Sequence, residues 1–184
     1  MNADGSLGDS HGWAERGAAL VEAGHDWGVA VTLTATLFDD EAIRTLLADS
    51  AARTAAVENL YAMVVAAGGD GINIDFEFVP EATSADVTSP KENFVTFIDE
   101  LAERFHSHEP RLHVSIATPA IDWGGTYDYS ELARLSDGLM IMGYGYHWSG
   151  GNPGPVAPLR ASELWGSYSL EWTVLDYLTW GGEE

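Results

Sequence analysis

The segment DGINIDFE, residues 70–77, constrains the possible folds of this chain more than any other stretch. Polar and apolar residues alternate strictly along it, and a period of two residues is typical of a β-strand. Such a strand places Asn73, Asp75 and Glu77 in one row on one face. Two carboxylates at adjacent positions of one face repel each other unless a substrate, a cation or a proton compensates them. The row therefore predicts a carboxylate site for acid–base chemistry.

Strand and helix patterns alternate along the rest of the chain. Period-2 or continuous apolar runs predict strands at 28–37, 70–77, 112–118 and 138–142. The run at 138–142 is continuous, which is typical of a strand buried on both faces. Apolar residues at helical spacing predict a helix opening near residue 39 and others at 50–67, 92–105, 130–135 and 170–178. This alternation predicts parallel β–α units.

The length of the chain limits how many such units it can hold. Its 184 residues suggest a single domain spanning 1–184, whereas a closed (β/α)8 barrel usually takes ~250 residues. We therefore expect an α/β fold that forms a partial or truncated (β/α)8 TIM barrel, with parallel strands and outer helices. A smaller open α/β sheet is the alternative. Because an open barrel exposes strand edges, we expect a second copy, in a homodimer, or further chain to cover them.

The composition excludes several classes of protein. A net charge of −21, from 8 basic and 29 acidic residues, argues against binding to nucleic acid or to anionic membranes. It fits either solubility by charge or adaptation to high salt, where self-repulsion is screened. No apolar run is long enough for membrane insertion, and the polar residues 1–5 are not those of a signal peptide. The absence of cysteine excludes disulfides and thiolate catalysis.

The carboxylate row lies where a parallel barrel carries its active site, at the C-terminal ends of the strands. Glu77 is at that end, and Asp75 is one pleat deeper, with Cα atoms ~6.6 Å apart. Such a pair can separate its proton affinities, so that Glu77 donates a proton while Asp75 stays ionised. Two alternatives are a solvated or salt-bridged pair, and a magnesium or calcium site formed by Asn73, Asp75 and Glu77.

Two segments resemble a known family. Residues 70–77 resemble the DGxDxDxE signature of glycoside hydrolase family 18, which contains chitinases and related N-acetylglucosaminidases. The closest form is that of the spore-cortex-lytic and germination-type peptidoglycan glycosidases. Residues 139–144, LMIMGY, are similar to the sixth strand of the family, which ends in Met-x-Tyr-Asp. Residues 112–119 and the loop at 147–158 also look like that branch, so the resemblance covers roughly residues 28–180, or strands three to six.

The resemblance implies a substrate-assisted, retaining hydrolysis that needs no metal or cofactor. Glu77 would protonate the glycosidic oxygen while the 2-acetamido oxygen of the substrate attacks the anomeric carbon. Asp75 would accept the acetamide N–H, and Tyr144 would donate to the acetamide oxygen. Glu77 would then act as general base for water. The implied partner is a glycan that contains N-acetylglucosamine, either chitin or peptidoglycan, which places the full-length protein outside the cell or in its envelope.

The sequence also departs from the family pattern. Asn73 stands where the family has an aspartate, and Gly145 replaces the aspartate that follows the tyrosine. No Ser-x-Gly-Gly motif is present at 29–37, and no segment matches strands one, seven or eight. A glycan-binding relative without turnover is therefore the second hypothesis.

Further residues are expected to contact the substrate. Trp123, Tyr146 and Trp148 follow the fifth and sixth strands, where aromatic rings either stack on sugars or pack in the loops. With Asn73 and Met142, they complete the predicted substrate-binding set.

Overall fold

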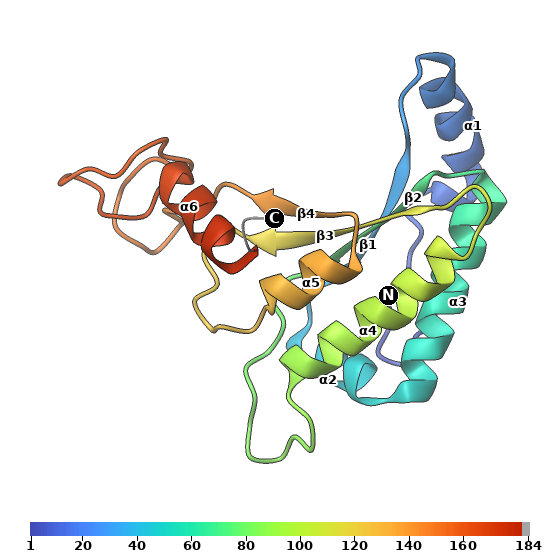
Figure 1. Cartoon of the computed structure of the whole chain (residues 1–184), viewed down its shortest axis with the longest axis horizontal. Helices are drawn as coiled ribbons and strands as arrows, with labels where there is room; N and C mark the ends of the chain where they lie inside the picture. The colour runs from blue at the N-terminus through green and yellow to red at the C-terminus, as the bar shows by residue number, and fades with distance from the viewer. Residues whose placement is uncertain (182–184) are drawn as a thin grey trace.

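The computed structural model describes residues 1–181 and contains one sheet of four parallel strands (Figure 1). The strands lie in chain order: β1 (Thr32–Leu37), β2 (Gly71–Phe76), β3 (His113–Pro119) and β4 (Gly138–Met142). The helices are α1 (Trp13–Asp26), α2 (Asp40–Ala48), α3 (Ser50–Ala67), α4 (Pro90–His106), α5 (Tyr129–Leu135) and α6 (Leu170–Gly181). The predicted alternation of strands and helices is confirmed. None of the helices within residues 1–181 has the length and apolarity to cross a membrane.

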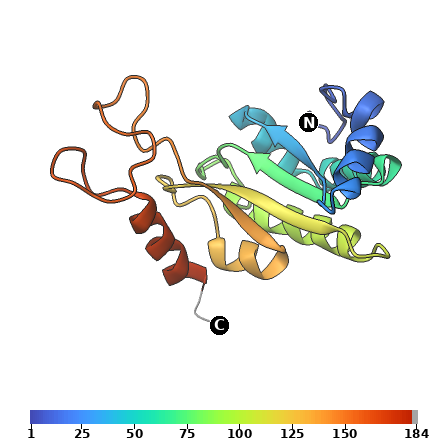
Figure 2. The same ribbon diagram turned by 90° about the horizontal axis from the view of Figure 1, so that it is seen from above.

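One face of the sheet carries the hydrophobic core. Helices α2 to α5 cover this outer face (Figures 1 and 2). The apolar residues of the opening motif, Ile72, Ile74 and Phe76, are buried there. Phe76 stacks on Phe97 of α4 with ring centroids 5.6 Å apart. Each large side chain buried in this way contributes about 1.5–3 kcal/mol, so the apolar half of the motif anchors β2.

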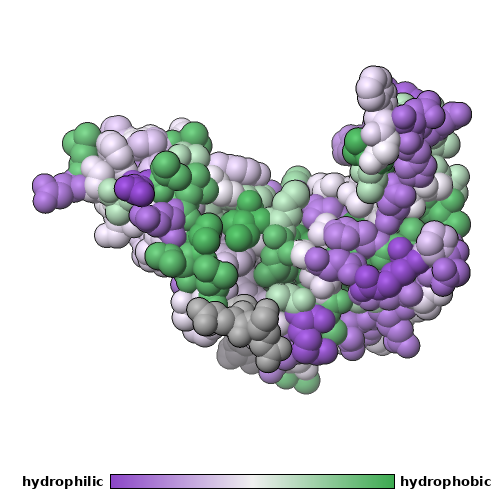
Figure 3. Space-filling model, turned by 45° about the horizontal axis from the view of Figure 1, so that its top comes forward, coloured by the Kyte–Doolittle hydropathy of each residue, from purple (hydrophilic) through white to green (hydrophobic). Residues whose placement is uncertain are grey.

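The opposite, inner face carries polar side chains on β1 and β2 and apolar ones, such as Met140, on β4, and no helix covers it in Figures 1 and 2. Residues paired across parallel strands share a face, and this pairing arranges the inward side chains in layers. One layer contains Thr34, Asn73, Ser115 and Gly138. Figure 3 shows the molecule hollowed between the end that carries α1 and the end that carries α6. The carboxylate row therefore lies on an open, concave face.

The structure differs from the sequence predictions in three places. Strand β1 begins at Thr32 and not at residue 28, and Val29 is exposed in the connection from α1. Helix α1 was not predicted, because it contains two glycines and buries only Gly17 and Val21, which leaves no strong apolar stripe. The prediction that 138–142 is buried on both faces is wrong. Strand β4 is an edge strand beneath an uncovered inner face, and Met140 is 53 % exposed.

Asp70 and Gly71, the first residues of the motif, lie at the end of β2 opposite the carboxylates. The Asp70 carboxylate accepts a hydrogen bond from Val31 N–H at 2.6 Å and lies 2.9 Å from His25 Nε2. A side chain at position 71 would collide with the carbonyl oxygen of His113, so glycine is required there. This half of the motif holds strands together and lies away from the carboxylates.

The same Asp-Gly arrangement occurs before β4. The carboxylate of Asp137, which precedes Gly138, accepts from Val114 N–H at 2.8 Å and pairs with Arg111 at 2.7 Å. In both cases the aspartate ties the start of its own strand to the start of the preceding strand. Two carboxylates thus fix the end of the sheet that is remote from the site.

Replacing Asp70 with alanine should destabilise the fold. Burial of the Asp70 carboxylate opposes its ionisation, but the hydrogen bonds from Val31 and His25 outweigh this effect and hold its pKa below the ordinary value. The variant leaves Val31 N–H unpaired, which should lower the free energy of unfolding by about 1–3 kcal/mol at pH 7. Urea denaturation measures this difference.

The effect of this substitution should depend on pH with a defined sign. A lowered pKa in the folded state contributes stability above the pKa of the unfolded chain, and this contribution is lost as pH falls through the folded-state pKa. The difference in the free energy of unfolding between wild type and Asp70→Ala should therefore become smaller as the pH falls. Asp26→Ala, which removes an exposed carboxylate of α1, is the control. If Asp70→Ala and Asp26→Ala lowered the free energy of unfolding equally, the role of Asp70 in tying β2 to β1 would be contradicted.

Candidate active site

The carboxyl end of β2 carries the predicted row of polar side chains. Asn73 and Asp75 pair with Thr34 and Thr36 of β1 and face inward. Glu77 continues the ladder one residue beyond β2, because its N–H donates to Leu37 C=O at 3.2 Å. Glu77 therefore stands at the mouth of the sheet, with Asp75 one layer below it.

The environment of the two carboxyl groups favours a proton on Glu77. Burial raises the pKa of Asp75, and the neighbouring Glu77 carboxyl partly offsets this rise. Burial also raises the pKa of Glu77, and the negative charge of Asp75 raises it further. Every interaction of Glu77 thus favours its protonated form, whereas one interaction of Asp75 favours its ionised form. A shared proton belongs on Glu77, which is the arrangement of a general acid beside a carboxylate.

A pocket of about 170 Å³ adjoins Glu77. It brings together residues from the ends of β2, β3 and β4 and from the loops that follow: Glu77, Phe78, Pro119, Ala120, Ile121, Trp123, Met142, Tyr144, Gly145 and Tyr146. Met142 is buried in its wall, while Tyr144 is 61 % exposed and Trp123 is 66 % exposed. The structure therefore places the predicted acid, the predicted tyrosine and one exposed aromatic ring around one cavity.

Three other predicted site residues lie differently. Tyr146 is only 6 % exposed, and its hydroxyl lies 2.6 Å from Thr173 Oγ1, so it forms a wall and offers no free ring for stacking. Trp148 is exposed but does not line the pocket. Asn73 is buried a layer below the carboxyl pair, where it accepts a hydrogen bond from Ser115 Oγ at 3.0 Å. Of these three, only Tyr146 borders the pocket, and it does so as a buried wall residue.

The hypothesis of an oxygen-ligand metal site finds no support in residues 1–181. That part of the chain contains no group of three histidine, cysteine or acidic side chains arranged to hold a metal ion. Asn73 Oδ1 is already engaged by Ser115. The row is better suited to proton transfer than to cation binding.

Tyr127 supports the turn that carries Glu77, a role that the sequence did not reveal. Its hydroxyl donates to Phe76 C=O at 2.8 Å and accepts from Val79 N–H at 3.4 Å, so it bridges the residues on either side of Glu77. Burial raises the pKa of Tyr127, which keeps the hydroxyl protonated as a donor. Asp122 in turn holds Tyr127 N–H at 2.9 Å. Asp122 therefore shapes the loop that carries Tyr127.

His147 anchors the long loop that follows β4. Its ring nitrogens lie 2.9 Å from Pro155 C=O and 3.1 Å from Trp165 C=O. A side chain at Gly154 would collide with this ring, so glycine leaves the space that the contact needs. The His147 imidazole thus joins two distant points of the loop that carries Tyr144 and Trp148.

Comparison with known proteins identifies the family. Residues 38–184 match the model of the glycosyl hydrolases family 18. YdhD of Bacillus subtilis (strain 168), named as a sporulation-specific glycosylase, is 33 % identical over 154 residues, which cover 77 % of this chain and 34 % of YdhD. The chain belongs to glycosyl hydrolases family 18.

Solved structures agree with this fold. The crystal structure of YdhD matches with a TM-score of 0.79 and 26 % identity over 98 % of this chain and 56 % of that one. The C-terminal domain of a chitinase from Desulfitobacterium hafniense DCB-2 matches with a TM-score of 0.81 at 23 % identity, over 99 % and 51 % of the two chains. The Group IV chitinase of Ostrinia furnacalis matches with a TM-score of 0.79 at 22 % identity, over 98 % and 52 %. The chain thus adopts part of the α/β barrel of these proteins and spans about half of each solved chain.

Tyr127→Phe should loosen the turn that carries Glu77. The variant removes the hydroxyl that bridges Phe76 and Val79, which should lower the free energy of unfolding by about 1–2 kcal/mol and speed amide exchange at Val79. Tyr129→Phe is a matched control, because the Tyr129 hydroxyl is buried with no hydrogen-bond partner in the described part of the chain. If both variants lose the same stability and Val79 exchanges unchanged, the role of Tyr127 is contradicted.

Proposed function

We propose that this chain is a glycosidase, or the catalytic part of one, that hydrolyses β-1,4 bonds next to N-acetylglucosamine in chitin or peptidoglycan. The observation that carries the proposal is the position of Glu77, with its raised pKa, at a pocket shared with Tyr144 and Trp123. Family membership supports a glycosidic substrate. Since both polymers lie outside the cytoplasm, we also propose a secreted or cell-envelope location for the full-length protein.

The proposed reaction uses only side chains of the site and the substrate. Glu77 gives its proton to the glycosidic oxygen, and the bond from that oxygen to the anomeric carbon breaks. The 2-acetamido oxygen of the substrate forms the new bond to that carbon, which leaves an oxazolinium ion. Asp75 accepts the acetamide N–H and balances the positive charge. Glu77 then takes a proton from the water that opens this ion, and no metal or cofactor takes part.

A glycan-binding protein without turnover is the second candidate. The observation that favours it is the uncovered inner face of the sheet, because general acid catalysis works best in a site that excludes water. The intact Glu77 favours the enzyme, since binding alone does not require an acid at that position.

Glu77→Gln should remove hydrolysis and leave binding. The amide keeps the shape of the side chain but has no acidic proton, so we expect at least a hundredfold lower kcat on chitooligosaccharides or peptidoglycan. Glu81→Gln, which changes a nearby acid outside the 170 Å³ pocket, is the matched control. Equal rates for wild type and Glu77→Gln would reject Glu77 as the acid, whereas glycan binding without turnover by either would favour the second candidate.

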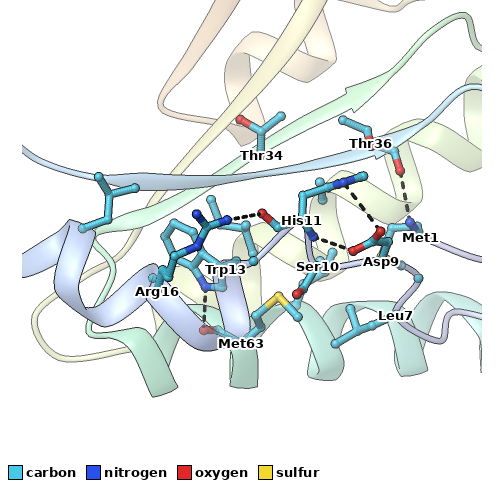
Figure 4. Close-up of a pocket in the computed structure, with 17 residues that line it drawn as sticks. Met1, Leu7, Asp9, Ser10, His11, Trp13, Arg16, Thr34, Thr36 and Met63 are labelled. Carbon is cyan, nitrogen blue, oxygen red and sulfur yellow. Dashed lines mark hydrogen bonds and ion pairs between the residues drawn. The ribbon is translucent and has the colours of Figure 1, made fainter.

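We further propose that a second copy covers the open edges of the sheet. The β1 edge adjoins a hollow of about 450 Å³, lined in part by Leu7, Trp13 and Met63 (Figure 4). The β4 edge, at the other end, exposes Met140. All strands are parallel, so β4 of one copy extends the parallel sheet by pairing with β1 of the other copy, in a head-to-tail contact. Two sets of four strands then supply the eight strands of a closed barrel. The charge of −21 per copy opposes this association, so salt should strengthen it.

The cysteine-free chain allows a direct test of the dimer. Thr34→Cys and Met140→Cys place thiols on the two open edges, and mixing the two single variants should give a disulfide-linked dimer in which each chain contributes one residue. Sizing of the wild type should show a dimer that strengthens with salt. Each variant alone is the control, since a head-to-tail contact does not bring identical edges together. A strict monomer at every salt concentration would contradict the proposal.

A further inference from the structure

Asn73 lies one layer below the carboxyl pair and is held in a defined orientation. It is 3 % exposed, and its Oδ1 accepts a hydrogen bond from Ser115 Oγ at 3.0 Å. Ser115 is the residue paired with Asn73 across β2 and β3, so the two side chains share the inner face. Because the oxygen of the amide is directed to β3, its nitrogen is directed away from Ser115.

Two buried polar atoms on this face lack partners in the part of the chain that the structure describes. One is Asn73 Nδ2, which can only donate, and the other is Asp75 Oδ1, which accepts when the carboxyl group is ionised. Buried polar atoms are normally paired, and an unpaired one is costly. The two residues are two positions apart on one strand, so their side chains are neighbours on one face. The unpaired donor and the unpaired acceptor are therefore complementary.

We propose that Ser115 and Asn73 act as a positioning pair that presents an amide N–H to Asp75, so that Asp75 stays ionised and the proton stays on Glu77. Ser115 fixes which end of the amide faces the carboxylate, and Asn73 supplies the donor. An amide neither ionises nor accepts the proton of Asp75, so this donor is present at every pH. The catalytic consequence rests on the proposed function, whereas the hydrogen bond itself does not.

The test follows the titration of the two carboxyl groups by carbon-13 NMR. Ser115→Ala frees the Asn73 amide to turn, and the pKa of Asp75 should rise by about one unit, a tenfold change in its ionisation equilibrium. Ser115→Thr keeps the hydroxyl and should restore the wild-type titration. Thr34→Ala is the matched control, because it removes a hydroxyl from the other neighbour of Asn73 in the same layer, one that makes no hydrogen bond to Asn73. This control should titrate like the wild type.

A second variant keeps the test decisive if Ser115→Ala does not fold. Asn73→Leu removes the donor itself and should also raise the pKa of Asp75. The proposal would be overturned if the pKa of Asp75 were unchanged in whichever of Ser115→Ala and Asn73→Leu folds. An equal rise of the Asp75 pKa in Thr34→Ala would also overturn the proposal. Loss of any hydroxyl from this layer would then have the same effect, and the Ser115–Asn73 hydrogen bond would not be its cause.

The pH dependence of hydrolysis gives an independent measurement. The acidic limb of kcat/KM reports the ionisation of Asp75, so it should move to higher pH in Ser115→Ala and return in Ser115→Thr. A merely structural role would lower the rate without moving this limb, which would overturn the assignment of a positioning role. If the wild type shows no turnover, the proposed function fails, while the NMR titration still decides between the presence and the absence of the pair.

Discussion

The repulsion between Asp75 and Glu77 is the constraint on which the site depends. The two carboxyl groups are placed at successive inward positions of one strand, and burial raises the pKa of both. Within residues 1–181 no basic side chain forms an ion pair with either group, and the negative charge of Asp75 favours the protonated form of Glu77. That proton is what a glycosidic oxygen needs in order to leave. In the proposed reaction, the electrostatic cost of the pair is therefore also the source of its chemistry.

The rest of the structure holds this unfavourable pair in place. The apolar residues of β2 anchor the strand in the core, and Asp70 ties its beginning to β1. Tyr127 then fixes the turn on either side of Glu77. These contacts come from different elements and hold the backbone on both sides of the carboxyl pair. Rigid support of this kind is what acid catalysis requires of a protein.

The sequence predicted the parts of this arrangement that have a local signal. Alternation within residues 70–77 defined β2 and its inward row, and α3 matches the predicted limits of 50–67 because Asp49 and Gly68 cap it. Helix α1 has no such apolar period, and the exposure of Met140 follows from the edge position of β4, which no local pattern encodes.

Contacts between distant segments could not be predicted either, because they leave no local pattern in the sequence. Tyr127 contacts Phe76 across 51 residues, and Tyr146 turns its hydroxyl to Thr173, 27 residues away. Its ring, expected at the mouth, is thereby buried. Residues of the site that depend on a strand period were thus predictable, whereas those that depend on loop packing were not.

The most direct measurement of the central claim is the pKa of the Glu77 carboxyl in the wild type and in Asp75→Asn. Carbon-13 NMR of the glutamate side chain gives this value without any assay of turnover. The account predicts that the pKa of Glu77 falls in the variant, because the negative charge of Asp75 is gone, and that it stays above the ordinary value, because burial remains. An unchanged or higher pKa of Glu77 in Asp75→Asn would contradict the claim that the two carboxyl groups act as a coupled pair.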